Sequence, residues 1–458
     1  MASRPPVGIP SNQTIRRDSP CVVSLMAIST IDNGRRRRQS SSAALGLPER
    51  ELDRILTGGL IRSVYQPLVD LDRGGIVAYE SLARGPVGSI LESPTALFET
   101  ALTAGREVEL DWACRVAAVD GAMRAGLPSS IALFVNVEPS SLGRPMPAAH
   151  RAAIERARDK LHIVLEITER ALASRPAELL ATIETIRAMG WAIALDDVGA
   201  EDVSAAFMPL LRPDVIKLDL GLIQGGSSAR AAAQLSAVIA EAERTGAIIL
   251  AEGIETEKHE RTARALGATI GQGWLFGRPA ALPDRFGLPA EPLGSLRLPG
   301  TTISATPVEA VFPGRRPRIA TKSDLVGFSR HLERWAHAVP GGAVVLAALQ
   351  DARFLTPATQ RQFAELAVSS PLVALLGLGL AAEPMPGVRG ATLTADDPLC
   401  GQWHVIVLGP HFAGALIARE LGDTGPDMDR RFEYLITFDR EAVIRAARSL
   451  MVRIVPTA

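Results

Sequence analysis

The sequence predicts an α/β protein built around a (β/α)8 barrel and followed by a second, smaller α/β domain. Three observations lead to this fold class. Eight short apolar runs rich in β-forming residues follow one another between residues 50 and 285. Stretches with apolar residues three and four positions apart, such as 177–189 and 229–244, separate most of these runs. This alternation is typical of βαβ units, and eight strands in a segment of this length match a barrel.

The eight expected strands begin with a hairpin. The first two runs are joined by a short turn, 70–75, that leaves no room for a helix, so the first strand should be antiparallel. Gly190 and Gly246 stand where helices should stop, because glycine readily takes the left-handed conformation that ends a helix. The strands are expected at 63–71, 75–82, 131–137, 162–167, 191–196, 215–218, 248–251 and 269–275.

Changes in composition divide the chain into segments. Residues 1–47 are rich in Ser, Pro and Arg and show no periodicity, which predicts a disordered tail. Its Arg35–Arg38 run is interpreted as solvated, with binding to an acidic surface or phosphorylation as alternatives, and Met26 is an alternative start. The barrel is expected over 50–285, and the Pro- and Gly-rich residues 286–306 are expected to form a linker.

Residues 307–455 are expected to form the second α/β domain. Its apolar patterns alternate between helical and strand-like periods, although they are less regular than those of the barrel. The expected helices lie at 322–339, 357–368, 412–421 and 440–451, and the expected strands at 343–348, 372–380 and 403–408. No catalytic constellation stands out here, which favours sensing or dimerisation over chemistry.

Composition and charge argue against several classes of protein. The formal net charge of −1 and the 47% of hydrophobic residues do not fit a nucleic-acid coat or a basic membrane-surface protein. Cys21, Cys114 and Cys400 lie far apart, so neither a disulfide scaffold nor a structural zinc site is expected. The longest apolar run, 371–382, is shorter than the about 20 residues that span a bilayer, and no signal peptide or DNA-binding motif is recognisable. We therefore expect a soluble cytoplasmic protein.

Polar residues fall at or just after the ends of the expected strands. The C-terminal ends of barrel strands converge on one mouth, where the chemistry of this fold takes place. A single carboxylate at a strand end is ordinary, whereas a series of them in corresponding positions indicates a site. The residues are Glu80, Asn136, Glu166, Glu169, Asp196, Asp197, Lys217, Asp219, Glu252, Glu255 and Gln272.

Such a cluster of carboxylates predicts bound divalent metal. Like charges brought together repel and raise one another's pKa values, and a divalent cation relieves this repulsion. Oxygen ligands without His or Cys favour Mg²⁺ or Mn²⁺ over zinc. Two such ions would clamp a phosphodiester and activate a water. Lys217 would add positive charge near the phosphate or the water, and Glu252 is the expected general base.

At these positions the sequence resembles the EAL family of bacterial cyclic-di-GMP phosphodiesterases. The resemblance covers about residues 50–285 and rests on motifs in the family's order. The signature tripeptide stands as Glu80-Ser81-Leu82 within YESLAR. Before it stands YQPL, and after it follow FVNVEPSSL, LEITERAL, ALDD, PDVIKLD, LAEGIET and GQGWLFGRP. One tripeptide alone would be weak evidence, whereas this ordered series is specific.

The resemblance implies a role for each matching residue. It implies that cyclic-di-GMP is cut to linear pGpG in a homodimer with a two-metal site. Lys217 would assist the attacking water, and Glu169 would anchor the loop after the fifth strand. Asp219 is assigned to substrate binding, although a structural role remains open for it and for Glu255. The implied metal ligands are Glu80, Asn136, Glu166, Asp196, Asp197 and Glu252, and the other implied substrate contacts are Gln66, Arg84 and Gln272.

The sequence departs from the family pattern at two places. Ser81 replaces the alanine of the signature, a small-for-small change away from the metal ligands. After the aspartate pair the family usually reads DDFGTGYSS, whereas residues 196–205 read DDVGAEDVSA. That loop is thought to couple metal binding to dimerisation in the family. Because this loop differs from the family pattern, the turnover rate, the metal dependence and the dimer geometry can differ from those of the family.

The C-terminal segment resembles the DICT sensory domain of bacterial signalling enzymes. The matching stretches include SDLVGFSRHLER and DDPLCGQWHVIVLGPHFAGALIARELGD. The ligand that such a domain would sense here is unknown, and His411 is interpreted as a structural histidine, with ligand binding as the alternative. Two further readings of the whole chain stay open beside the hydrolase. One is a catalytically weak EAL domain that acts as a cyclic-di-GMP receptor, and the other is a signalling scaffold.

Overall fold

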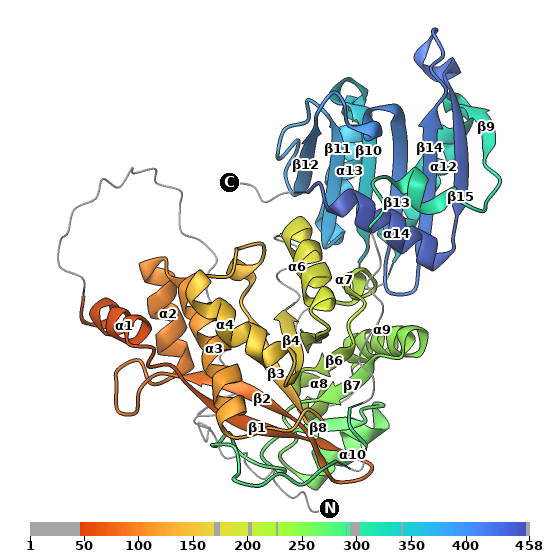
Figure 1. Cartoon of the computed structure of the whole chain (residues 1–458). Helices are drawn as coiled ribbons and strands as arrows, with labels where there is room; N and C mark the ends of the chain where they lie inside the picture. Colours follow the sequence, from red (N-terminus) through yellow and green to blue (C-terminus); the bar gives the residue numbers. More distant parts are fainter. Residues whose placement is uncertain are drawn as a thin grey trace, which may run out of the picture.

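The first domain is a closed barrel whose eight strands follow one another in chain order (Figure 1). The computed structural model describes residues 46–168, 175–199, 204–225, 228–289, 291–293, 303–339 and 342–454. Strand β1 pairs antiparallel with both β2 and β8, and the other neighbours pair in parallel, which confirms the predicted barrel. The strands are β1 (Arg62–Asp70), β2 (Ile76–Arg84), β3 (Ala132–Val137), β4 (His162–Thr168), β5 (Ala192–Val198), β6 (Val215–Leu218), β7 (Ile248–Ala251) and β8 (Ile270–Gln272).

Helices pack around the outside of the barrel and extend it at one edge. Helices α1, α2 and α3 enclose a small apolar cluster of their own beside the first hairpin. The predicted tail falls almost entirely outside the described residues, as does part of the predicted linker. The helices are α1 (Leu47–Thr57), α2 (Pro94–Ala104), α3 (Glu107–Arg124), α4 (Ala148–Arg158), α6 (Pro176–Ala188), α7 (Ser204–Leu211), α8 (Leu220–Gln224), α9 (Ala229–Thr245) and α10 (Glu257–Ala265).

The barrel strands are apolar on both faces. In β3, Ala132 and Phe134 belong to the cluster that fills the barrel, whereas Leu133 and Val135 pack outward against the helices. Side chains of a strand alternate between its two faces, and both faces are buried here. This is why the strands could be recognised in the sequence as continuous apolar runs.

The second domain is a seven-stranded sheet in the order β12-β11-β10-β13-β14-β15-β9. Helix α14 packs on one face, and α12 and α13 pack on the other (Figure 1). The strands are β9 (Arg318–Thr321), β10 (Val344–Asp351), β11 (Leu372–Leu378), β12 (Val388–Leu393), β13 (Gln402–Leu408), β14 (Ala413–Glu420) and β15 (Arg431–Thr437). The helices are α11 (Pro307–Val311), α12 (Lys322–Ala338), α13 (Pro357–Ser369) and α14 (Arg440–Met451).

One predicted element of this domain is wrong. A helix was predicted at 412–421, but strand β14 lies there, paired antiparallel with β13 and β15. Residues Ala413–Ala418 are all buried because β14 lies inside the sheet with both faces covered. A short run that is apolar on every side fits a buried helix and a central strand equally well.

Among the helices of the described residues, none combines the length and the apolar character that a membrane span requires.

A buried histidine lies in the centre of the second domain. His404 on β13 is 0% exposed, and its Nδ1 accepts a hydrogen bond from the Ala418 backbone N–H at 3.3 Å. Its Nε2 therefore carries the proton and donates to Gln402 Oε1 at 2.9 Å. Burial lowers the pKa of His404 from 6.5 to about 3, since a second proton would charge a ring that water does not reach.

His404 should make the second domain sensitive to acid. The unfolded chain takes up this proton near pH 6.5 and the folded chain only near pH 3, so stability falls as pH drops through that range. Between pH 7 and pH 5 this one group should remove about 2 kcal/mol of unfolding free energy. We expect His404→Gln to lose that part of the pH dependence in urea unfolding. The control His337→Gln, on an exposed position, should keep it, and equal pH slopes in all three proteins would contradict this account.

Candidate active site

Most of the polar residues predicted at the strand ends converge at one end of the barrel. Lys217 of β6 contacts carboxylates from β2, β4 and β5 and the carboxylate that follows β7. Strands β2 to β8 run in parallel, so their C-terminal ends share one rim. The structure brings together Glu80, Asn136, Glu166, Asp196, Asp197, Lys217, Glu252, Gln66 and Gln272.

Asp196 and Asp197 are neighbours in the chain and still reach the same site. Side chains of an ordinary strand alternate, so two successive aspartates would point to opposite faces. The pairing of β5 with β6 shifts between Leu195 and Val198, and Asp197 has a φ of 58°. This bulge turns the second carboxylate towards the first, and the Asp197 backbone N–H donates to Asp196 Oδ1 at 2.9 Å.

The left-handed backbone at Asp197 leads to a prediction about stability. Asparagine tolerates this conformation nearly as well as aspartate, whereas alanine should cost about 1 kcal/mol more. In EDTA, where no metal contributes, we expect Asp197→Asn to unfold at higher urea concentration than Asp197→Ala. Identical midpoints for the two variants would show that the backbone conformation at this position is not strained.

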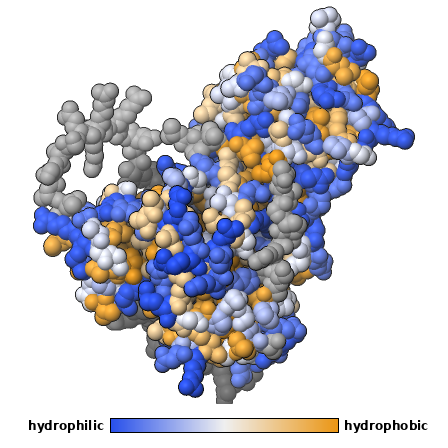
Figure 2. Space-filling model, viewed as in Figure 1, coloured by the Kyte–Doolittle hydropathy of each residue, from blue (hydrophilic) through white to orange (hydrophobic). Residues whose placement is uncertain are grey.

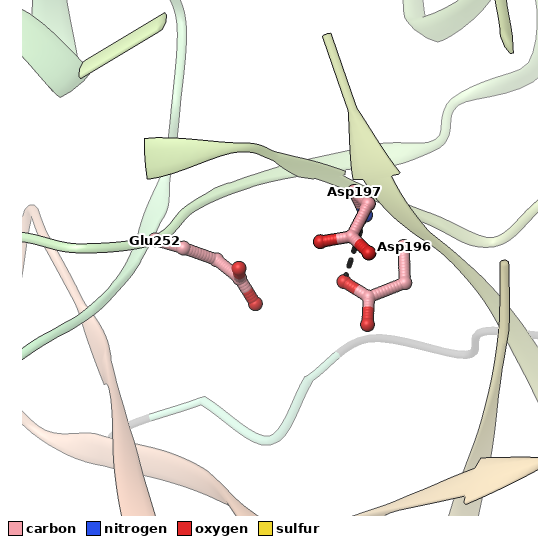
Figure 3. A group of neighbouring side chains, drawn as sticks. All are labelled: Asp196, Asp197 and Glu252. Atoms are coloured by element: carbon pink, nitrogen blue, oxygen red, sulfur yellow. Dashed lines mark hydrogen bonds between the residues drawn. The ribbon is translucent and has the colours of Figure 1, made fainter. Parts of the chain in front are cut away.

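Three carboxylates lie close enough together to hold one divalent ion. Oxygens of Asp196, Asp197 and Glu252 all lie within 4.8 Å of one another, and Figure 3 shows the three side chains around a shared space. Asp196 and Asp197 come from β5, and Glu252 comes from the turn after β7. All three donors are hard oxygens, which suit Mg²⁺ or Mn²⁺.

Lys217 lies among four carboxylates, two of which belong to the group of three just described. Its side chain is 1% exposed, and its Nζ is 2.5 Å from Glu166 Oε1, 2.9 Å from Asp196 Oδ1 and 2.7 Å from Glu252 Oε1. Glu80 Oε1 is 4.0 Å away. Burial alone would lower the pKa of Lys217, but the surrounding carboxylates outweigh it and raise the pKa well above 10.5. The lysine is therefore a fixed positive charge.

Two of these carboxylates hold protons more tightly than usual. Burial, with Glu80 and Asp196 nearby, raises the pKa of Glu166 well above 4.5 in spite of Lys217. Burial also raises the pKa of Glu252 to about 8, and Asp196 and Glu80 add to this effect. Among the described residues, Glu166 Oε2 has no hydrogen-bond partner although it is buried. A buried carboxylate oxygen without a donor fits a bound cation.

Glu80 is held in place by two amide side chains, those of Gln272 and Asn136, and Gln66 supports the first of them. Gln272 Nε2 donates to Glu80 Oε2 at 2.5 Å and to Gln66 Oε1 at 3.1 Å, and Asn136 Nδ2 donates to Glu80 Oε1 at 3.2 Å. Gln66 in turn donates to the Gly277 carbonyl oxygen at 3.1 Å. These bonds fix the orientation of the carboxylate, a role of Gln66 and Gln272 that was not predicted from the sequence. Their contact with substrate stays a prediction.

A model of the EAL domain family matches residues 49–279, just over half of the chain. The chain belongs to the EAL family. A second model, that of the DICT domain, matches residues 306–421, C-terminal to the EAL domain. This domain is described as a sensory domain in diguanylate cyclases and two-component systems.

Relatives of the EAL domain include two proteins of Pseudomonas aeruginosa named cyclic di-GMP phosphodiesterases. RocR is 32% identical over 229 residues, which cover 49% of this chain and 58% of RocR. NbdA is 29% identical over 241 residues, covering 51% of this chain and 31% of NbdA. The similarity thus spans only part of either relative.

Solved structures also match the EAL domain. One is the P. aeruginosa MucR phosphodiesterase in complex with c-di-GMP, with a TM-score of 0.44, 26% identity and coverage of 51% of this chain and 97% of that one. Another is Klebsiella pneumoniae BlrP1 in complex with manganese and cyclic-di-GMP. It has a TM-score of 0.43 and 24% identity, and the match covers 48% of this chain and 56% of that one.

The serine in the EAL signature is accommodated without strain on the site. Ser81 is buried, and its hydroxyl donates to the Phe134 carbonyl oxygen at 2.8 Å on the neighbouring strand. The extra polar atom is therefore satisfied by the neighbouring strand and makes no contact with Glu80 in the hydrogen bonds described above. That the substitution is harmless to activity stays a prediction.

The structure does not show a direct role in the site for the remaining predicted site residues of the EAL domain that it describes. Asp219 caps helix α8, where its Oδ1 accepts from the Gly221 N–H at 2.7 Å, so the structural role left open for it has a physical basis. Arg84, at the end of β2, donates to the Ala83 carbonyl oxygen at 2.8 Å. Glu169 lies outside the described residues, as do Glu201 and Asp202 of the divergent loop. Roles of these residues towards substrate stay predictions.

One supporting pair near the mouth was missed in the sequence. Asp111 on α3 forms a buried ion pair with Arg115 one turn further along the helix. Its other oxygen accepts from the Glu138 backbone N–H at 3.2 Å, two residues beyond Asn136. The pair thereby fixes the end of β3. An acid and a base four residues apart in a largely apolar helix were the available signal.

Proposed function

We propose that the EAL domain hydrolyses cyclic-di-GMP to linear pGpG with the help of bound Mg²⁺ or Mn²⁺. The observation that carries this proposal is the group of three carboxylates within 4.8 Å of one another at the barrel mouth. The relatives RocR and NbdA, both named cyclic di-GMP phosphodiesterases, support the substrate and the reaction. Bound divalent metal would polarise the phosphodiester and lower the pKa of the attacking water.

The proposed metal ligands divide into two sets. Asp196, Asp197 and Glu252 would hold one ion, and Glu80, Asn136 and Glu166 would contribute to a second. Lys217 stands between the sets and would balance part of the negative charge in either case. These assignments rest on donor chemistry and on the contacts described above.

The proposed proton acceptor is Glu252. Burial raises the pKa of Glu252 above that of an ordinary carboxylate, which makes its deprotonated form a stronger base, and a bound divalent cation would favour that deprotonated form. In the hydrolysis, the water oxygen bonds to phosphorus, the bond from phosphorus to one ribose oxygen breaks, and that oxygen takes up a proton. The charged Lys217 would offset the negative charge that grows on the phosphate oxygens.

Metal dependence offers a direct test of the reaction. Purified full-length protein should convert cyclic-di-GMP in the presence of Mn²⁺, stop when EDTA is added, and resume when Mn²⁺ is returned in excess. Binding of the nucleotide without any conversion would favour the receptor function instead. The DICT domain is proposed to modulate the reaction.

A further inference from the structure

The C-terminal domain rests on the barrel through helix α14. This helix contacts α6 and α7, and one apolar cluster includes residues from all three helices. Figure 1 shows α14 on the side of its sheet that faces α6, α7 and α9, and Figure 2 shows hydrophobic surface where the two domains meet. The α14 face is therefore a packed interface between the domains.

Two charged residues of α14 bind the helices of the barrel. Arg448 is 2% exposed, and its Nη2 donates to Glu184 of α6 at 2.5 Å. Glu441, in the first turn of α14, forms an ion pair with Arg244 of α9 through one oxygen. Its other oxygen lies 3.8 Å from Nη1 of Arg212. The two residues are seven positions apart, so they lie on the same face of the helix.

Helix α7 connects two of the strands that carry residues of the candidate site. It lies between β5, which carries Asp196 and Asp197, and β6, which carries Lys217. Arg212 ends this helix in a left-handed conformation, with a φ of 51°. Arg187 of α6 donates to the carbonyl oxygens of Leu211 and Arg212, at 3.2 and 2.5 Å. The end of α7 is thus held from α6 and lies beside Glu441.

We propose that α14 positions the β5–α7–β6 segment, and with it the metal-binding aspartates, through Glu441 and Arg448. Both are positioning residues, since neither touches the site itself. The effect on metal binding rests on the proposed function of the barrel mouth. The contacts of Glu441 and Arg448 with the barrel helices are independent of that function. A ligand that loosens the C-terminal domain from α6 and α7 would then weaken metal binding in the barrel.

The interface between α14 and the barrel includes buried polar atoms that favour its release. Within the described part of the chain, Nε and Nη1 of Arg448 have no hydrogen-bond partner although they are buried. Burying guanidinium donors without partners costs free energy, so the closed interface is less stable than its apolar packing alone would make it. Undocking would return these donors to water.

Three full-length variants test the proposal. Glu441→Gln and Arg448→Gln each remove one contact to the barrel. Arg445→Gln is the matched control, because Arg445 lies on the same helix but donates to the Ala310 carbonyl oxygen within its own domain. The readouts are hydrogen exchange of residues 204–218 by mass spectrometry and the affinity for Mn²⁺ by calorimetry.

We expect the first two variants to speed exchange across 204–218 and to weaken Mn²⁺ binding about fivefold, while the control matches the wild type. Wild-type exchange and affinity in folded Glu441→Gln and Arg448→Gln would overturn the proposal. Glu441 is partly exposed at the edge of the interface, so its variant carries the test if Arg448→Gln fails to fold. Absence of cyclic-di-GMP hydrolysis in the wild type would count against the proposed function only, because neither readout depends on turnover.

Discussion

Replacing Glu80 by alanine is expected to lower cyclic-di-GMP hydrolysis by at least about a hundredfold and to leave the barrel folded. The Glu80 carboxylate receives hydrogen bonds from Gln272 and Asn136, so its orientation is set before any ligand binds. Its removal would take away one proposed metal ligand and one acceptor from each of the two amides, although Gln272 would keep its bond to Gln66. Product formation by the purified variant, measured by chromatography against the wild type, checks the expectation.

A glutamate outside the site serves as control for this substitution. Glu257 on α10 is exposed and pairs only loosely with Arg261, 3.7 Å away. Glu257→Ala should retain wild-type turnover. If Glu80→Ala also turns over at the wild-type rate, the carboxylate at this position has no part in catalysis.

Lys217→Met should strongly destabilise the metal-free protein. Glu166, Asp196 and Glu252 would then lie together without the ammonium that contacts all three, and breaking a buried ion pair on one side costs about 3–5 kcal/mol. Addition of Mn²⁺ should recover part of the loss, because a divalent cation supplies the missing positive charge. Urea unfolding in EDTA and in Mn²⁺ measures both effects, with the exposed Lys258→Met as control.

The same substitution has an expected dependence on pH. The pKa values of Glu166 and Glu252 are already raised in the folded protein, so their contribution favours folding at low pH and is lost as pH rises towards about 8. Without Lys217 both values should rise further. The destabilisation should therefore be smaller at pH 5 than at pH 8, and a loss that is equal at both pH values would argue against clustered carboxylates as its cause.

Much of the barrel could be predicted because its strands are buried on both faces. The runs that became β3 and β4 are apolar at almost every position, and each is followed by helical periodicity. The strand ends then brought Glu80, Glu166 and Asp196 to one rim, as the (β/α)8 architecture requires. The local pattern and the global fold agree in this part of the chain.

Other features depend on contacts that the sequence does not encode locally. The bulge that turns Asp197 beside Asp196 follows from the pairing of β5 with β6. The bond from Gln272 to Glu80 links positions far apart in the chain. The docking of α14 on α6 and α7 likewise depends on the placement of one domain against another. In β14, uniform burial removed the periodicity that separates a strand from a helix.

The product formed from cyclic-di-GMP tests the central claim most directly. The full-length protein at micromolar concentration should be incubated with cyclic-di-GMP and Mn²⁺, and the nucleotides separated by chromatography while binding is measured on the same sample. The carboxylate site at the barrel mouth predicts accumulation of linear pGpG that depends on Mn²⁺. Unchanged cyclic-di-GMP in a sample that binds the nucleotide would contradict the account and identify the chain as a receptor.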